Sequence, residues 1–172
     1  LAYSGKRDFD KAIEYAEKAQ DVSALALAYC GKRDFSLALK YAQEANDSSA
    51  LALIYSQMND FYSAINFARE VNDLSGLGMA YLGKKEFETA LNFFTEANDF
   101  AGLSLVYSGK RQFEKAINYA KQANDVSALG VAYLGMRQFD AAIHYFTQAN
   151  DLTGLSLAYT GKRQFDKAID YA

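Results

Sequence analysis

The chain has 172 residues, of which 51% are apolar, so it is too hydrophobic to be an intrinsically disordered tail. Its formal net charge of −3 argues against a general nucleic-acid binder, which would normally carry a basic excess. No apolar run approaches the ~18 residues that a membrane span needs. The single cysteine excludes an internal disulfide framework and fits a reducing compartment, so we expect a cytoplasmic protein.

Three kinds of residue recur along the chain at a constant spacing of 26 positions, without one insertion. A fixed period of this size indicates one supersecondary unit copied along the chain, and such units stack into a solenoid. Solenoids usually present a surface to a partner rather than a catalytic pocket. The recurring residues are Tyr3, Tyr29, Tyr55, Tyr81, Tyr107, Tyr133 and Tyr159; Phe9, Phe35, Phe61, Phe87, Phe113, Phe139 and Phe165; and Ala12, Ala38, Ala64, Ala90, Ala116, Ala142 and Ala168.

The first helix of a complete unit is predicted over residues 22–30, which are rich in Ala and Leu. Asp21 is its N-cap candidate, and Gly31 is expected to end it as a C′ glycine. Lys32 and Arg33 then make the turn. This helix carries no charged side chain. A helix without a polar face is normally buried, or it lines a surface that another molecule covers.

The second helix of the unit is predicted over residues 35–45, with Asp34 as its N-cap. Asn46 suits a left-handed C-cap, and Asp47 begins the next unit. The second helices are amphipathic, and the small residue repeated at the position of Ala38 predicts a close approach between helices. In the first copy the apolar stripe consists of Phe9, Ala12, Ile13, Ala16 and Ala19.

The string from Ala2 to Tyr15 resembles the centre of a tetratricopeptide repeat: an Ala-Tyr pair, a turn, an aromatic residue, then Ala-Ile and a further aromatic residue. The framework positions of that family are matched by Leu25, Tyr29, Phe35, Ala38 and Ala45, with Val22 where the family often has Trp. The resemblance recurs over the whole chain. The unit here is shorter than the usual ~34 residues, and Arg7 stands where the family commonly has Gly.

Period and resemblance together predict an all-α fold, a right-handed solenoid of stacked antiparallel helical hairpins with about six and a half units. We expect a single tetratricopeptide-like array over residues 1–172. Because the sequence starts and stops inside a unit, we expect it to be a fragment of a longer array.

In the resembled family the first helices line a concave groove that binds peptides. The resemblance therefore implies a protein or peptide partner held by an apolar row, with a row of small polar residues beside it. The family's carboxylate-binding Lys, Arg and Asn are absent at the matching positions, so an apolar or amphipathic segment suits the groove better. The predicted partner-binding residues are Leu27, Leu53, Met79, Leu105, Val131, Leu157, Ser49, Ser75 and Ser127.

Two alternatives stay open for this row. Tight curvature or a second chain could bury it, which would make the protein a structural spacer or a self-assembling array, with a homo-oligomer as the product. The array could also be the sensor or targeting arm of a larger enzyme or signalling protein. The sequence supports no enzyme on its own, because no catalytic constellation, cofactor motif or metal-binding pattern is present.

In the C-terminal half the units also alternate in size, with a period of 52 residues. Leu82 occurs with Phe94 and Leu134 with Phe146, whereas the other complete pairs at these positions are small, such as Cys30 with Ala42. We favour packing between neighbouring units as the explanation, since interiors are close-packed. Exposed Leu-Phe patches for a partner are the alternative.

The turns predict a basic edge, and the starts of the first helices predict an acidic-leaning edge. Both complement the helix macrodipoles, which is the explanation we favour over steering of an acidic partner. Gln57-Met58-Asn59 breaks the basic series, which counts against a nucleic-acid track. His144 is expected to be solvated, and Cys30 reads as a small filler. The basic residues are Lys6, Arg7, Lys32, Arg33, Lys84, Lys85, Lys110, Arg111, Arg137, Lys162 and Arg163.

Overall fold

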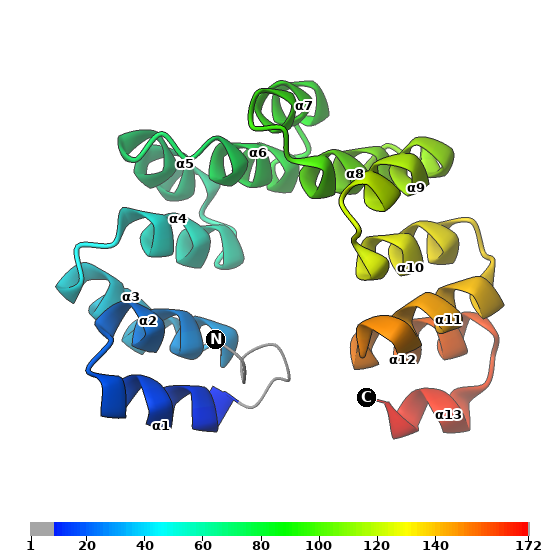
Figure 1. The fold of residues 1–172 in the computed structure, drawn as a ribbon, viewed down its shortest axis with the longest axis horizontal. Coiled ribbons are helices and arrows are strands. Elements are labelled where there is room, and N and C mark those ends of the chain that lie inside the picture. The colour runs from blue at the N-terminus through cyan, green and yellow to red at the C-terminus, as the bar shows by residue number, and fades with distance from the viewer. Residues whose placement is uncertain (1–8, 172) are drawn as a thin grey trace. The chain divides into compact units, whose positions relative to one another are not determined.

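The computed structural model describes residues 9–171, which form thirteen short α-helices and no strand. Each helix has six to eleven residues, and Figure 1 shows them following one another in chain order. The chain divides into two compact units, residues 1–86 and 87–172. Consecutive helices within each unit pack against each other as helical hairpins, so the predicted all-α solenoid is confirmed.

The first unit contains six helices in the part of the chain that is described. They are α1 (Phe9–Ala19), α2 (Val22–Gly31), α3 (Phe35–Glu44), α4 (Ser48–Gln57), α5 (Phe61–Glu70) and α6 (Leu74–Gly83). The even-numbered helices are the predicted first helices of each repeat. They also contact one another, α2 with α4 and α4 with α6, and so form a continuous layer.

The second unit has the same construction. Its helices are α7 (Phe87–Glu96), α8 (Phe100–Gly109), α9 (Phe113–Gln122), α10 (Val126–Gly135), α11 (Phe139–Ala149), α12 (Leu152–Gly161) and α13 (Phe165–Asp170). The first helices again touch in sequence, α8 with α10 and α10 with α12.

Every turn between two described helices uses the same backbone motif. After α2, the N–H of Arg33 donates to the Cys30 carbonyl and the N–H of Asp34 donates to the Tyr29 carbonyl, which is the Schellman pattern. Arg33 adopts a left-handed conformation with a φ of 63°. Asp34 also caps α3, because its carboxylate accepts from the N–H of Leu37 at 3.2 Å. One aspartate therefore closes one helix and starts the next.

The turns after the second helices have the same arrangement. After α3, Asn46 takes the left-handed position, with a φ of 50°, and Asp47 ends one helix and caps the next. The predicted caps at Asp21, Asp34 and Asp47 and the left-handed Asn46 are thus confirmed. A ten-residue helix plus three turn residues gives thirteen positions, and two such halves account for the 26-residue period.

The prediction for Gly31 was wrong. Gly31 is the last helical residue of α2, and no glycine in the described residues has a positive φ. Its role is steric: a Cβ on Gly31 would lie 2.2 Å from the ring of Phe9 on the preceding second helix. The same contact recurs where Gly135 meets Phe113. The glycine lets two helices approach, and the left-handed position falls two residues later.

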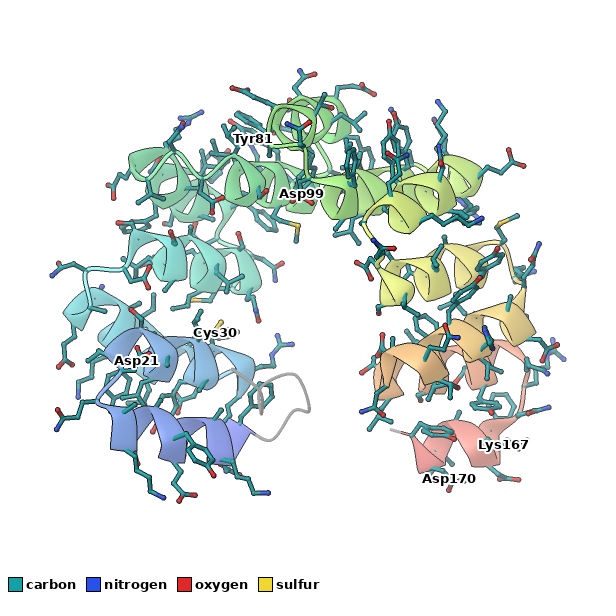
Figure 2. All side chains as sticks on the ribbon, viewed as in Figure 1. Asp21, Cys30, Tyr81, Asp99, Lys167 and Asp170 are labelled. Atoms are coloured by element: carbon teal, nitrogen blue, oxygen red, sulfur yellow. The ribbon has the colours of Figure 1, made fainter. Side chains whose placement is uncertain are left out.

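The core is built largely from alanine. Ala38, Ala64 and Ala142 have no exposed surface, which confirms the close helix approach predicted for this position. Phe94 and Phe146 are 0% and 1% exposed, so the size alternation reflects packing and not exposed patches. Cys30 of α2 is 1% exposed and packs in one cluster with residues of α3 and α4, as expected of a small filler (Figure 2).

Candidate partner-binding groove

The first helices divide their apolar residues between two opposite faces. Leu25, Leu51 and Leu77 are buried, at 4–7% exposed, toward the interior of the first unit. Residues two positions later point the other way, because two residues turn an α-helix by about 200°. Leu27 is accordingly 37% exposed, and Leu53 and Met79 are 45% and 44% exposed. The apolar row is on the surface and is not buried by stacking within the chain.

A groove of about 700 Å³ lies over α2, α4 and α6 in the first unit. Its walls bring together every predicted partner-binding residue of this unit: Leu27, Ser49, Leu53, Ser75 and Met79. Its apolar lining also includes Ala50, Ala52, Phe61 and Leu82.

The polar lining of the groove differs between its two ends. At the start of α4 and α6 lie the carboxylates of Asp47 and Asp73, which cap these helices by accepting from the N–H groups of Ala50 and Gly76 at 2.9 and 2.8 Å. At the end of α4 lie the neutral amides of Gln57 and Asn59. No lysine or arginine lines the groove.

Neither aspartate is among the partner-binding residues that the sequence predicts. The sequence predicts an acidic-leaning edge at the starts of the first helices, where both aspartates lie, and a break in the basic edge at Gln57-Met58-Asn59. Among the turns that follow a described first helix, this is the only one without a lysine or arginine, and Gln57 and Asn59 line the groove.

In the second unit the predicted residues occupy the corresponding face of α8, α10 and α12. Val131 and Leu157 are 39% and 55% exposed, whereas Leu105 is half-buried. The hydroxyl of Ser127 donates to the carboxylate of Asp151 at 3.1 Å, so this serine links α10 to the cap of α12. Binding by any of these residues stays a prediction.

The basic edge takes part in holding hairpins together. The ammonium of Lys32 bonds the carboxylate of Asp10 at 2.7 Å, and Lys110 and Lys162 pair with Glu88 and Asp140 in the same way. The hydrogen bond that Lys32 donates to Asp10 raises the pKa of Lys32, and the one that Lys84 donates to Glu86 raises the pKa of Lys84. Water screens exposed pairs of this kind, so each contributes little to stability.

The potentially reactive residues are dispersed. Burial raises the pKa of the Cys30 thiol. His144 is exposed, as predicted, with its ring edge-on to Tyr145. Residues 9–171 contain no group of three or more His, Cys, Asp or Glu side chains placed to hold a metal ion. None of the helices within the same range is long and apolar enough to cross a membrane.

Comparison with known proteins supports the repeat architecture. A family model described as "Tetratricopeptide repeat" matches residues 1–24 and 126–154. These segments lie on repeats that the 26-residue period relates to each other. No curated protein and no solved structure matched the chain.

Proposed function

We propose that this protein is an interaction scaffold, which holds an apolar or amphipathic segment of a partner protein along its first-helix face. The proposal starts from the chain being a tetratricopeptide-like helical repeat protein. Repeats of this family typically serve as non-catalytic scaffolds for protein–protein interaction. The binding face and the type of segment are our inference from the groove.

One observation carries the proposal: the exposed apolar residues of three successive first helices converge on a single groove. Leu27, Leu53 and Met79 are each more than a third exposed, although the same helices bury other leucines almost completely. The groove volume lies within the range of about 300–1,000 Å³ seen for preformed binding sites. Covering such side chains removes apolar surface from water at roughly 25 cal/mol per Å², which favours association.

The test is a pull-down from lysate of the source cells with the wild-type chain and the double variant Leu53→Glu, Met79→Glu. The matched control is Leu152→Glu, which changes a residue of similar exposure, 43%, outside the groove. We expect one or more proteins to be recovered by wild type and by the control, and to be lost with the double variant. Circular dichroism checks that all three chains keep the same helix content.

Recovery of the same proteins by wild type and the folded double variant would contradict the groove as the binding site. A second copy of the chain is the other candidate occupant, and light scattering separates the two cases. A molecular mass that rises with concentration for wild type, but not for the double variant, would assign the groove to self-association instead.

A further inference from the structure

The charge lining the groove differs from the charge of the chain's other turns. Most repeats place a Lys-Arg or Lys-Lys pair after the first helix, as at Lys32-Arg33 and Lys84-Lys85. The repeat at the centre of the groove has Met58-Asn59 there instead. All the formal charge among the lining residues therefore comes from two carboxylates, Asp47 and Asp73, at the opposite end.

Capping leaves these carboxylates able to bind a further group. In each carboxylate, Oδ1 accepts a hydrogen bond from the backbone N–H three residues later, at 2.9 Å for Asp47 and 2.8 Å for Asp73. An ionised carboxylate has about four acceptor sites, so Oδ2 can still accept. The helix N-terminus contributes roughly +0.5 of an elementary charge, which offsets part but not all of each −1.

Both aspartates are also half-buried against the groove wall. A charge that is partly removed from water interacts more strongly with an incoming ion than a fully exposed one does. An acidic residue of a partner would meet two like charges there, with no lysine or arginine in the lining to balance it. A lysine or arginine would meet complementary charge and leave neither carboxylate uncompensated.

We propose that the groove selects a basic-apolar segment, in which apolar side chains cover Leu27, Leu53 and Met79 and a lysine or arginine binds between Asp47 and Asp73. This inference rests on the proposed function and specifies the partner's chemistry and its direction. The cationic residue sets the orientation, because the Gln57 and Asn59 end offers only neutral hydrogen-bonding groups.

The probe is a phage-displayed library of random 16-residue peptides, selected on the full chain. An enriched peptide is then synthesised with a fluorophore, and its affinity is measured by fluorescence anisotropy. Three variants are compared with wild type: Leu53→Glu, the pair Asp47→Asn with Asp73→Asn, and the control pair Asp21→Asn with Asp125→Asn. Asparagine is as good an N-cap as aspartate, so each pair removes two charges without removing the caps. Asp21 and Asp125 cap α2 and α10 and do not line the groove.

We expect the enriched peptides to combine apolar residues with lysine or arginine. The double substitution Asp47→Asn with Asp73→Asn should weaken binding roughly tenfold, equivalent to ~1.4 kcal/mol. The control double substitution should leave the affinity unchanged. Replacing the peptide's basic residue by glutamine should weaken binding to wild type by a similar factor. The same replacement should have little effect on binding to the Asp47/Asp73 variant, because the partner charges are already gone.

Two outcomes would overturn the inference in distinguishable ways. Leu53→Glu could abolish binding while the double substitution Asp47→Asn with Asp73→Asn leaves it unchanged. The groove would then bind segments without selecting for their charge, and the proposed function would stand. If no peptide is enriched, or if neither substitution affects binding, both the charge selection and the groove fail.

Discussion

Phe146 is a large residue at a position that most repeats fill with alanine, and its neighbours compensate for its size. A Cβ on Gly130 would lie 2.6 Å from the Phe146 ring, and a Cβ on Gly154 would lie 2.3 Å from it. Where Ala120 replaces the phenylalanine, Ser104 stands at the position of Gly130 and donates its hydroxyl to the Ala116 carbonyl at 2.9 Å. The volume between helices is filled in both cases, by different side chains.

The substitution Gly154→Ala should destabilise the chain, because the new methyl group has no room beside Phe146. Overpacking of this kind costs about 1–3 kcal/mol, which outweighs the ~1 kcal/mol gain in helix propensity. Phe146→Ala alone should cost about 3–5 kcal/mol. In the Phe146→Ala background, Gly154→Ala should become stabilising. Chemical denaturation of the four chains gives the coupling free energy.

Gly76→Ala is the matched control for this cycle. Gly76 holds the same position in α6, but the atoms nearest to its added Cβ would belong to the flexible Asp73 carboxylate. Ala50 already occupies the equivalent position in α4 with its cap intact. We expect Gly76→Ala to leave stability unchanged or slightly raised. A loss as large as that of Gly154→Ala would show that glycine itself, not the Phe146 contact, sets the requirement.

Asp60 provides a prediction about acid stability. Hydrogen bonds from the Ser63 hydroxyl at 2.7 Å and the Ser63 N–H lower its pKa below the usual 3.8. A lowered folded-state pKa stabilises the fold above the unfolded pKa, and this contribution is lost as the pH falls through the folded value. Ser63→Ala should raise the pKa of Asp60 toward its ordinary value. A carboxyl-carbon NMR titration measures the change, and an unaltered pKa would exclude the hydroxyl as the main cause.

At the scale of the element, the helices are short and depend on their caps. The second helices of the early repeats begin with Asp34 and Asp60, whose carboxylates accept from the backbone. Later ones begin with Gln112, Gln138 and Gln164, whose side chains make no cap hydrogen bond. The backbone follows the same path in each case. The glutamine turns therefore lack a side-chain cap hydrogen bond that an aspartate at the same position could make.

Gln138→Asp should therefore stabilise the protein, because it supplies the missing cap to α11. Loss of such a cap costs about 0.5–2 kcal/mol, so the gain should be up to about 1 kcal/mol. Asp34→Ala should produce a loss of similar size at the equivalent turn. Thermal unfolding followed by circular dichroism gives both changes. A melting temperature for Gln138→Asp equal to or below that of wild type would contradict the cap argument.

At the scale of the whole molecule, the period predicted the helices, their caps and their order, because those depend on local residues such as Asp47 and Asn46. The sequence did not predict the role of Gly31, which depends on a phenylalanine ring from the preceding hairpin. It placed Leu53 and Met79 on one face correctly. That Asp47, Asp73 and Asn59 would share a groove with them depends on how α4 and α6 pack, which no local pattern encodes.

Because each hairpin touches mainly its neighbours, damage should stay local. Phe146→Ala should lower the hydrogen-exchange protection of amides in α10, α11 and α12, which surround that side chain, and leave α2 to α4 unchanged. Native-state exchange followed by mass spectrometry measures both regions at once. An equal fall in protection along the whole chain would instead indicate a single cooperative unfolding step.

The space that Gly130 leaves for Phe146 also limits how the gene can change length by unequal recombination. Loss of residues 105–130, one period, would bring Ser104 to the position of Gly130, where a side chain meets the Phe146 ring. Loss of residues 79–130, two periods, would bring Gly78 there instead. For a deletion that ends at residue 130, removal of two repeats therefore preserves the packing around Phe146, whereas removal of one repeat disrupts it.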